Sequence, residues 1–91
     1  MLTIKKINEI TIENNICSID YIEFFKDKGR NYRTVVDLDL NWLTSYIQDN
    51  YGLTVSDWVE KVTPKQLIKL FCFIDETGCN CIDYAIGWPV K

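Results

Sequence analysis

The chain has 91 residues, a formal net charge of −3 and no histidine. This length suits one domain, residues 1–91, because a second core would need about another hundred residues. The 47% hydrophobic content is too high for a disordered chain. The lack of histidine removes the usual general base and the commonest metal ligand. No segment resembles a signal peptide or a membrane span, so we expect a cytoplasmic protein without membrane contact.

The first third of the chain is rich in β-branched and aromatic residues, which favour strands. The isoleucines of residues 2–13 fit a strand and a short helix equally well, and two asparagines after them indicate a turn. Residues 16–25 and 30–38 each alternate between the two faces of a strand, and Gly29 suits the loop between them. We therefore predict an antiparallel hairpin or, if 2–13 is extended, a three-stranded meander.

From Asp39 the apolar residues follow a helical period. A helix over 40–51 is predicted, with Asp39 as its N-cap and Gly52 at its end. A second, short helix is predicted over 55–62. The segment Thr63-Pro64-Lys65-Gln66 combines a hydroxyl cap, a proline at the first helical position and a glutamine at the third, which predicts a helix over 64–76 closed by Gly78.

The last element predicted is a strand over 80–86, because apolar and small or polar residues alternate there. A run of strands, then helices, then a strand is typical of an α+β fold. We therefore expect one small α+β domain in which the last strand joins an antiparallel sheet and the helices cover one face.

Four cysteines raise the question of a metal site. Cys79 and Cys81 form a Cys-x-Cys pair, and Cys17 and Cys72 are the candidates for a third and a fourth zinc ligand. Structural zinc sites usually have two to four residues between paired cysteines, and there is no second pair. Cys72 is predicted on the apolar side of its helix, where a thiol acts as a small hydrophobe. We therefore favour reduced structural thiols, with zinc and a disulfide as the alternatives.

Nothing in the sequence resembles a catalytic constellation. None of the serines lies in a nucleophile elbow, and there is no glycine-rich phosphate loop or dinucleotide fingerprint. Asp37 and Asp39 lie two residues apart at the junction between a strand and a helix, where a cap and a turn suit them better than acid–base catalysis. We expect no enzyme activity, and we assign no catalytic or cofactor-binding residue.

Cations and spare aromatic residues are the candidates for partner binding. The cations are concentrated around the predicted hairpin loop, where a basic hairpin can follow a phosphate backbone or meet an acidic protein surface. Lysines there also have an ordinary explanation, because they keep an edge strand soluble. Two aromatic side chains, on the polar side of the third helix and near the C-terminus, are either buried by packing or anchor an interface. The candidate residues are Lys26, Lys28, Arg30, Tyr32, Arg33, Phe73 and Trp88.

By elimination, we expect a non-enzymatic protein-binding module. Many isoleucines, asparagines and lysines but only two arginines suggest an AT-rich bacterial or phage genome. In that setting the hypothesis is a small inhibitor of a larger nucleic-acid-processing enzyme, such as a host defence (CRISPR-type) nuclease. The alternatives are a nucleic-acid-binding accessory protein that uses hairpin residues 26–33, and a small zinc-stabilised domain. Edge strands and spare aromatics allow either a monomer or a homodimer.

Overall fold

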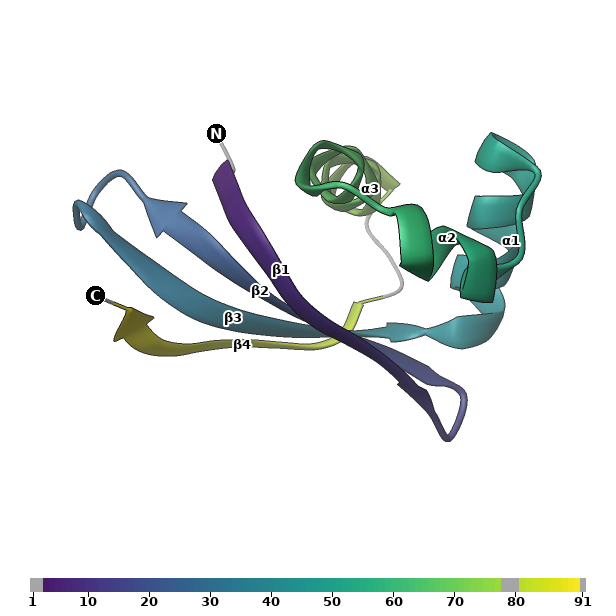
Figure 1. Ribbon diagram of the computed structural model, residues 1–91, viewed down its shortest axis with the longest axis horizontal. Coiled ribbons are helices and arrows are strands. Elements are labelled where there is room, and N and C mark those ends of the chain that lie inside the picture. Colours follow the sequence, from purple (N-terminus) through teal and green to yellow (C-terminus); the bar gives the residue numbers. More distant parts are fainter. Residues whose placement is uncertain (1–2, 78–80, 91) are drawn as a thin grey trace.

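An antiparallel sheet carries helices on one of its faces (Figure 1). The computed structural model describes residues 3–77 and 81–90, with the backbone alone for residues 77, 81–86 and 88. Within these residues the sheet has four strands in the order β1-β2-β3-β4, and three helices separate β3 from β4. In chain order the elements are β1 (Thr3–Glu13), β2 (Ile16–Phe25), β3 (Arg30–Asp39), α1 (Leu40–Tyr51), α2 (Val55–Lys61), α3 (Pro64–Thr77) and β4 (Cys81–Val90). The predicted α+β fold is confirmed.

β1 settles the ambiguity of residues 2–13 in favour of a strand. Its isoleucines at positions 4, 7 and 10 are spaced by three, whereas a regular strand needs a spacing of two to keep one face. The β1–β2 register shifts between Ile4 and Lys6 and again between Ile7 and Glu9. Each shift is a bulge that places an extra residue on β1, which returns the next isoleucine to the helix-covered face.

The core lies between the helices and one face of the sheet. Alternate residues of the two central strands point into it, as predicted, and α1 and α3 each contribute an apolar stripe. The largest side chain buried there is that of Trp58, on α2, which is 1% exposed. The other fully buried side chains include Cys17, Ile19, Tyr21, Thr34, Leu38, Leu43, Ile47, Leu67 and Leu70.

The helices begin where the sequence predicts, and the predicted ends of α2 at 62 and of α3 at 76 each differ by one residue from the observed ends at Lys61 and Thr77. The Asp39 carboxylate accepts a hydrogen bond from the Trp42 backbone N–H (3.0 Å), and α1 ends at Gly52, whose φ is 65°. At the start of α3 the Thr63 hydroxyl accepts from the Gln66 N–H (3.3 Å). The Gln66 side chain in turn accepts from the Thr63 N–H (3.1 Å), which completes a capping box. Gly78, the predicted end of α3, lies outside the described residues.

β4 is longer than predicted, because it continues to Val90 instead of ending at residue 86. The predicted strand ends before Gly87 and Pro89, because glycine and proline are unfavourable inside a sheet. Both fit here because β4 is an edge strand, where a proline need not donate to a neighbour. The β3–β4 register also shifts between Tyr32 and Thr34, next to Gly87.

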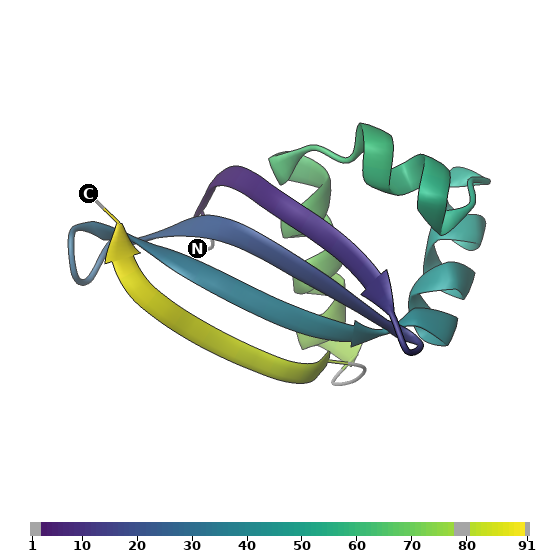
Figure 2. The same cartoon turned by 60° about the horizontal axis from the view of Figure 1, so that its bottom comes forward.

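The helices cover only part of the sheet. The loop between β2 and β3 extends beyond them, and the end of β4 lies beside it (Figures 1 and 2). The sheet face opposite the helices has no described element against it. Among the described residues, no helix is long and apolar enough to cross a bilayer.

Candidate interaction surfaces

The loop between β2 and β3 forms a tight turn. Gly29 has a φ of 63°, and its N–H donates to the Phe25 carbonyl (2.8 Å), as does the Lys28 N–H (3.1 Å). β2 and β3 pair without interruption up to Phe25 and Arg30. We call Phe25–Tyr32 the hairpin tip. These backbone hydrogen bonds hold the turn in one conformation.

The hairpin tip carries most of the predicted cations. Lys26, Lys28 and Arg30 are exposed, together with a single acid, Asp27. None of these three cations forms an ion pair with any residue that the structure describes. The tip therefore presents positive charge that the rest of the described chain does not neutralise.

Aromatic residues lie next to this turn on both strands. The rings of Phe25 and Tyr32 meet edge to face, with centroids 5.2 Å apart. Phe24, which points to the opposite sheet face, has the Lys5 ammonium 5.4 Å from its ring centroid. Tyr32 was among the candidate residues, whereas the two phenylalanines were not. Phe25 and Arg30 are cross-strand partners, so a hairpin that turns at Gly29 places Phe25 beside this patch.

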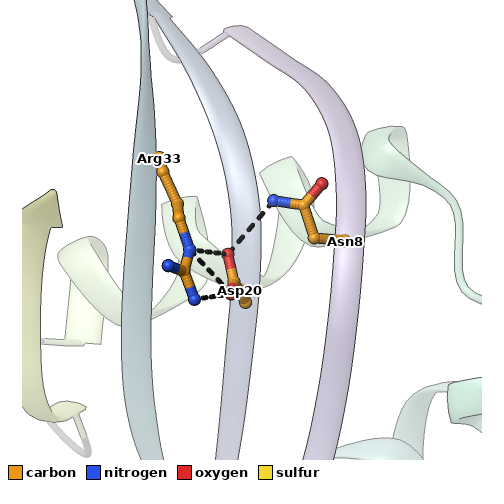
Figure 3. A network of polar contacts seen from close by, with 3 residues as sticks. All are labelled: Asn8, Asp20 and Arg33. Atoms are coloured by element: carbon orange, nitrogen blue, oxygen red, sulfur yellow. Dashed lines mark hydrogen bonds and ion pairs between the residues drawn. The ribbon is translucent and has the colours of Figure 1, made fainter. Parts of the chain in front are cut away.

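Arg33 does not join the tip. Its Nε lies 2.9 Å and its Nη2 2.5 Å from Oδ2 of Asp20, which also accepts a bond from Asn8 at its other oxygen (3.2 Å; Figure 3). The hydrogen bond from Arg33 is the main cause that lowers the pKa of Asp20 below its ordinary value. Sequence reasoning missed this pair, although Asp20 and Arg33 are diagonal neighbours on one face of the predicted hairpin.

The same end of the sheet contains a hollow next to a buried carboxylate. Glu23 is 6% exposed, continues the inward-pointing row of β2, and accepts a hydrogen bond from the Tyr21 hydroxyl (3.4 Å). The hollow is lined by Thr3, Glu23, Phe24, Phe25, Lys26 and Asp27. The alternation of residues 16–25 predicts that position 23 points inward, which makes the glutamate the exception in an apolar row.

Phe73 lies apart from the hairpin tip, on α3. It is 39% exposed, and its ring centroid lies 5.2 Å from that of Tyr46 and 6.2 Å from that of Trp42, both on α1. It therefore connects α3 to α1 while one side of the ring stays accessible. Trp88 lies in β4, but its side chain is outside the described residues.

The cysteines do not form a recognisable metal site in the described part of the chain. Cys17 is buried in the sheet, and burial, with the nearby Asp37 carboxylate, raises its pKa to about 11. Cys72 is exposed on α3, so its predicted place on the apolar side of the helix is wrong. The apolar residues near Cys72 in the sequence form a wide stripe on α3, but only part of this stripe packs into the core. Leu67 and Leu70 are buried, whereas Ile68 and Phe71 are half-buried. Cys79 and the side chain of Cys81 lie outside the described residues, and no group of three metal-ligating side chains occurs among the rest.

The two carboxylates at the junction between β3 and α1 have structural partners. Asp37 accepts a short hydrogen bond from the Ser18 hydroxyl on the neighbouring strand, and Asp39 caps α1. The cap predicted at Asp39 is confirmed, whereas Asp37 lies within β3 and not in a turn.

No protein-family model, curated protein or solved structure matches this chain.

Proposed function

We propose that this chain is a non-enzymatic protein-binding module whose hairpin tip contacts an acidic surface on its partner. The observation that carries the proposal is the arrangement of the tip. The β2–β3 loop extends beyond the helices (Figure 1), and its exposed cations Lys26, Lys28 and Arg30 form no ion pair with any described residue. Aromatic residues and arginine are enriched at contacts between proteins, and complementary charge steers two partners together.

The tip is also suited to binding because it loses little freedom when a partner docks. Its turn is closed by backbone hydrogen bonds, and the Phe25–Tyr32 ring pair fixes two large side chains. Ordering flexible groups costs binding free energy, so an interface that is already ordered binds more tightly for the same contacts. Arginine and tyrosine, both present here, are enriched among residues that dominate binding energy.

A narrower form of the proposal names the partner. Enzymes that cut nucleic acids commonly hold divalent metal ions with clustered carboxylates. Such a cluster is an acidic target within a groove, and a narrow basic hairpin has a suitable shape and charge to enter it. The chain would then inhibit a larger nucleic-acid-processing enzyme, such as a phage-encoded or bacterial inhibitor of a defence nuclease.

Nucleic acid is the alternative partner of the same tip. The pairing of Arg33 with Asp20 counts against it, because it removes one of four predicted phosphate contacts and leaves the remaining three cations close to Asp27. Three phosphate contacts would give a slope of log affinity against log salt of about −3 on duplex DNA.

The test compares two charge-reversed variants. The first carries Lys26→Glu, Lys28→Glu and Arg30→Glu. The control carries Lys61→Glu, Lys65→Glu and Lys69→Glu, which reverses the same number of exposed cations on α2 and α3. Immobilised wild-type chain, presented with bacterial lysate, is expected to retain a stoichiometric protein that the control also retains and the tip variant loses.

Two results would contradict the proposal. Equal capture by both variants would place the contact elsewhere on the molecule. Gel-shift binding of DNA or RNA by the wild-type chain, lost in the tip variant and steeply weakened by salt, would favour the nucleic-acid alternative.

A further inference from the structure

The sheet face opposite the helices, here called the open face, has a distinctive charge pattern. Directly paired residues point to the same face of a sheet, so the register assigns its members. On β1, β2 and β3 they include Thr3, Lys6, Glu9, Thr11 and Glu13, then Ile16, Ser18, Asp20, Ile22 and Phe24, and then Asn31, Arg33, Val35 and Asp37. No described helix lies against them (Figures 1 and 2).

Charge changes sign along the strands of this face. On β1, Lys6 lies towards the hairpin-tip end, Glu9 near the middle and Glu13 at the far end. On β3, Arg33 lies towards the tip end and Asp37 towards the far end. β1 and β3 thus run from basic to acidic in the same direction, and the Arg33 charge on β3 is shared with Asp20 of β2.

The middle of the open face is partly apolar. Ile22 and Val35 lie in adjacent rows of the β2–β3 pair, because their direct partners are Arg33 and Asp20. Both side chains are only half-buried. An apolar centre with charged residues around it is the usual layout of a protein–protein contact.

We infer that the open face binds the open face of a second copy of this chain, with the two-fold axis running across the strands at the level of the Ile10–Ile19 pair, which lies midway between the Lys6–Ile22 and Glu13–Ile16 pairs. An axis along the strands would place the basic end of one copy on the basic end of the other. An axis across the strands instead brings Lys6 over Glu13 of the second copy. Because a two-fold interface repeats every contact, the pairing is formed twice.

This arrangement leaves the hairpin tips accessible. The axis reverses the strand direction, so the two tips project at opposite ends of the dimer. Two sheets stacked face to face bury apolar side chains between them at a spacing of about 10 Å. The inference is independent of the proposed function, because its test uses the purified chain without a partner.

The test measures self-association by sedimentation equilibrium for the wild type and four variants. The single variants Lys6→Glu and Glu13→Lys each place two like-charge contacts in the dimer, and the combination of both restores opposite charges. The control, Lys65→Glu, changes the charge as Lys6→Glu does, but at an exposed position on α3.

We expect a wild-type dimer that weakens between about 50 and 500 mM salt, because exposed charge pairs are screened. Each single variant should dissociate about tenfold more readily, and the combined variant and the control should resemble the wild type. A wild-type chain that stays monomeric at several hundred micromolar overturns the inference. So does a dimer that Lys6→Glu and Lys65→Glu affect equally, or one that the combined variant does not restore.

Discussion

Gly87 lies where β4 passes close to the backbone of β3. A Cβ at this position would be 2.9 Å from the Arg33 carbonyl oxygen, a contact that neither backbone can relieve without moving. Gly29 needs its glycine for another reason, since it has open space around it but a φ of +63°. Gly87 is therefore required for steric reasons, and Gly29 for its backbone conformation.

We expect Gly87→Ala to lower the free energy of unfolding by about 2 kcal/mol, because β4 must shift away from Arg33. Gly29→Ala should cost about 1 kcal/mol, the penalty for a side chain in the left-handed region. Urea denaturation followed by tryptophan fluorescence measures both. A smaller loss at Gly87 than at Gly29 would show that the edge strand absorbs the contact.

The Asp20–Arg33 pair makes stability depend on acidity. Because Arg33 lowers the pKa of Asp20 in the folded state, the folded chain holds fewer protons on this group than the unfolded chain. The stabilisation is therefore present above the ordinary aspartate pKa of about 3.9, and it is lost as the pH falls through the lower folded value.

Removing the cation should flatten this dependence. In Arg33→Met, the stability lost between about pH 5 and pH 2.5 should be smaller than in the wild type, because the pKa of Asp20 returns towards its ordinary value. Urea unfolding at the two pH values measures the loss, and carboxyl NMR titration follows Asp20 itself. Equal losses in both proteins would mean that Asn8 and the sheet, not Arg33, set this pKa.

At the scale of elements, β1 and α3 show how local chemistry produces defined boundaries. Two bulges let β1 follow a three-residue isoleucine spacing, and they also interrupt its free edge, which limits pairing with other chains. The capping box of α3 satisfies backbone groups at both Thr63 and Gln66. α3 packs across β1, so the start of this helix helps to position the edge strand.

We expect Thr63→Ala to destabilise the chain by about 1 kcal/mol, through the loss of the hydrogen bond to the Gln66 N–H. Thr44→Ala is the matched control, because Thr44 is exposed within α1 and its hydroxyl bonds only the Leu40 carbonyl (2.7 Å). That change should stay within about 0.5 kcal/mol of the wild type. Thermal unfolding compares them, and similar effects at both positions would argue against a contribution from the cap.

At the scale of the whole molecule, folding gathers charges that the sequence spreads out. Lys5 and Lys6 of β1 lie near the hairpin tip, because Ile4 pairs with Glu23 and Lys6 with Ile22. The exposed acids of α1, α2 and the end of α3 lie on the helices, away from the tip. The molecule therefore has a basic end and an acidic remainder, although its net charge is small.

The cations of the tip should contribute little to folding. Reversal of Lys26, Lys28 and Arg30 to glutamate is expected to change the free energy of unfolding by less than about 0.5 kcal/mol, because none is paired within the described chain. Arg33→Glu, by contrast, should destabilise the chain measurably, since the new carboxylate faces Asp20. Chemical denaturation distinguishes the two. A strongly destabilised tip variant would show that these cations support the fold.

The elements of this fold follow closely from sequence patterns. Alternation over 16–25, the caps at Asp39 and Thr63, and the glycines at 29 and 52 each act through a few neighbouring residues, so local chemistry is enough to place them. The candidate binding residues do not all lie together. The tip cations and Tyr32 come together, but Arg33 leaves them and Phe73 lies on another element.

What only the tertiary structure decided depends on contacts between distant residues. The strand at 2–13 needed bulges opposite β2, the extension of β4 needed a place at the sheet edge, and the partner of Arg33 needed the neighbouring strand. The sequence by itself determined where the two central strands and the three helices lie, to within a residue, because caps, turns and periodicity are local. Packing decided which charges remain unpaired, because an ion pair joins side chains that are far apart in the chain.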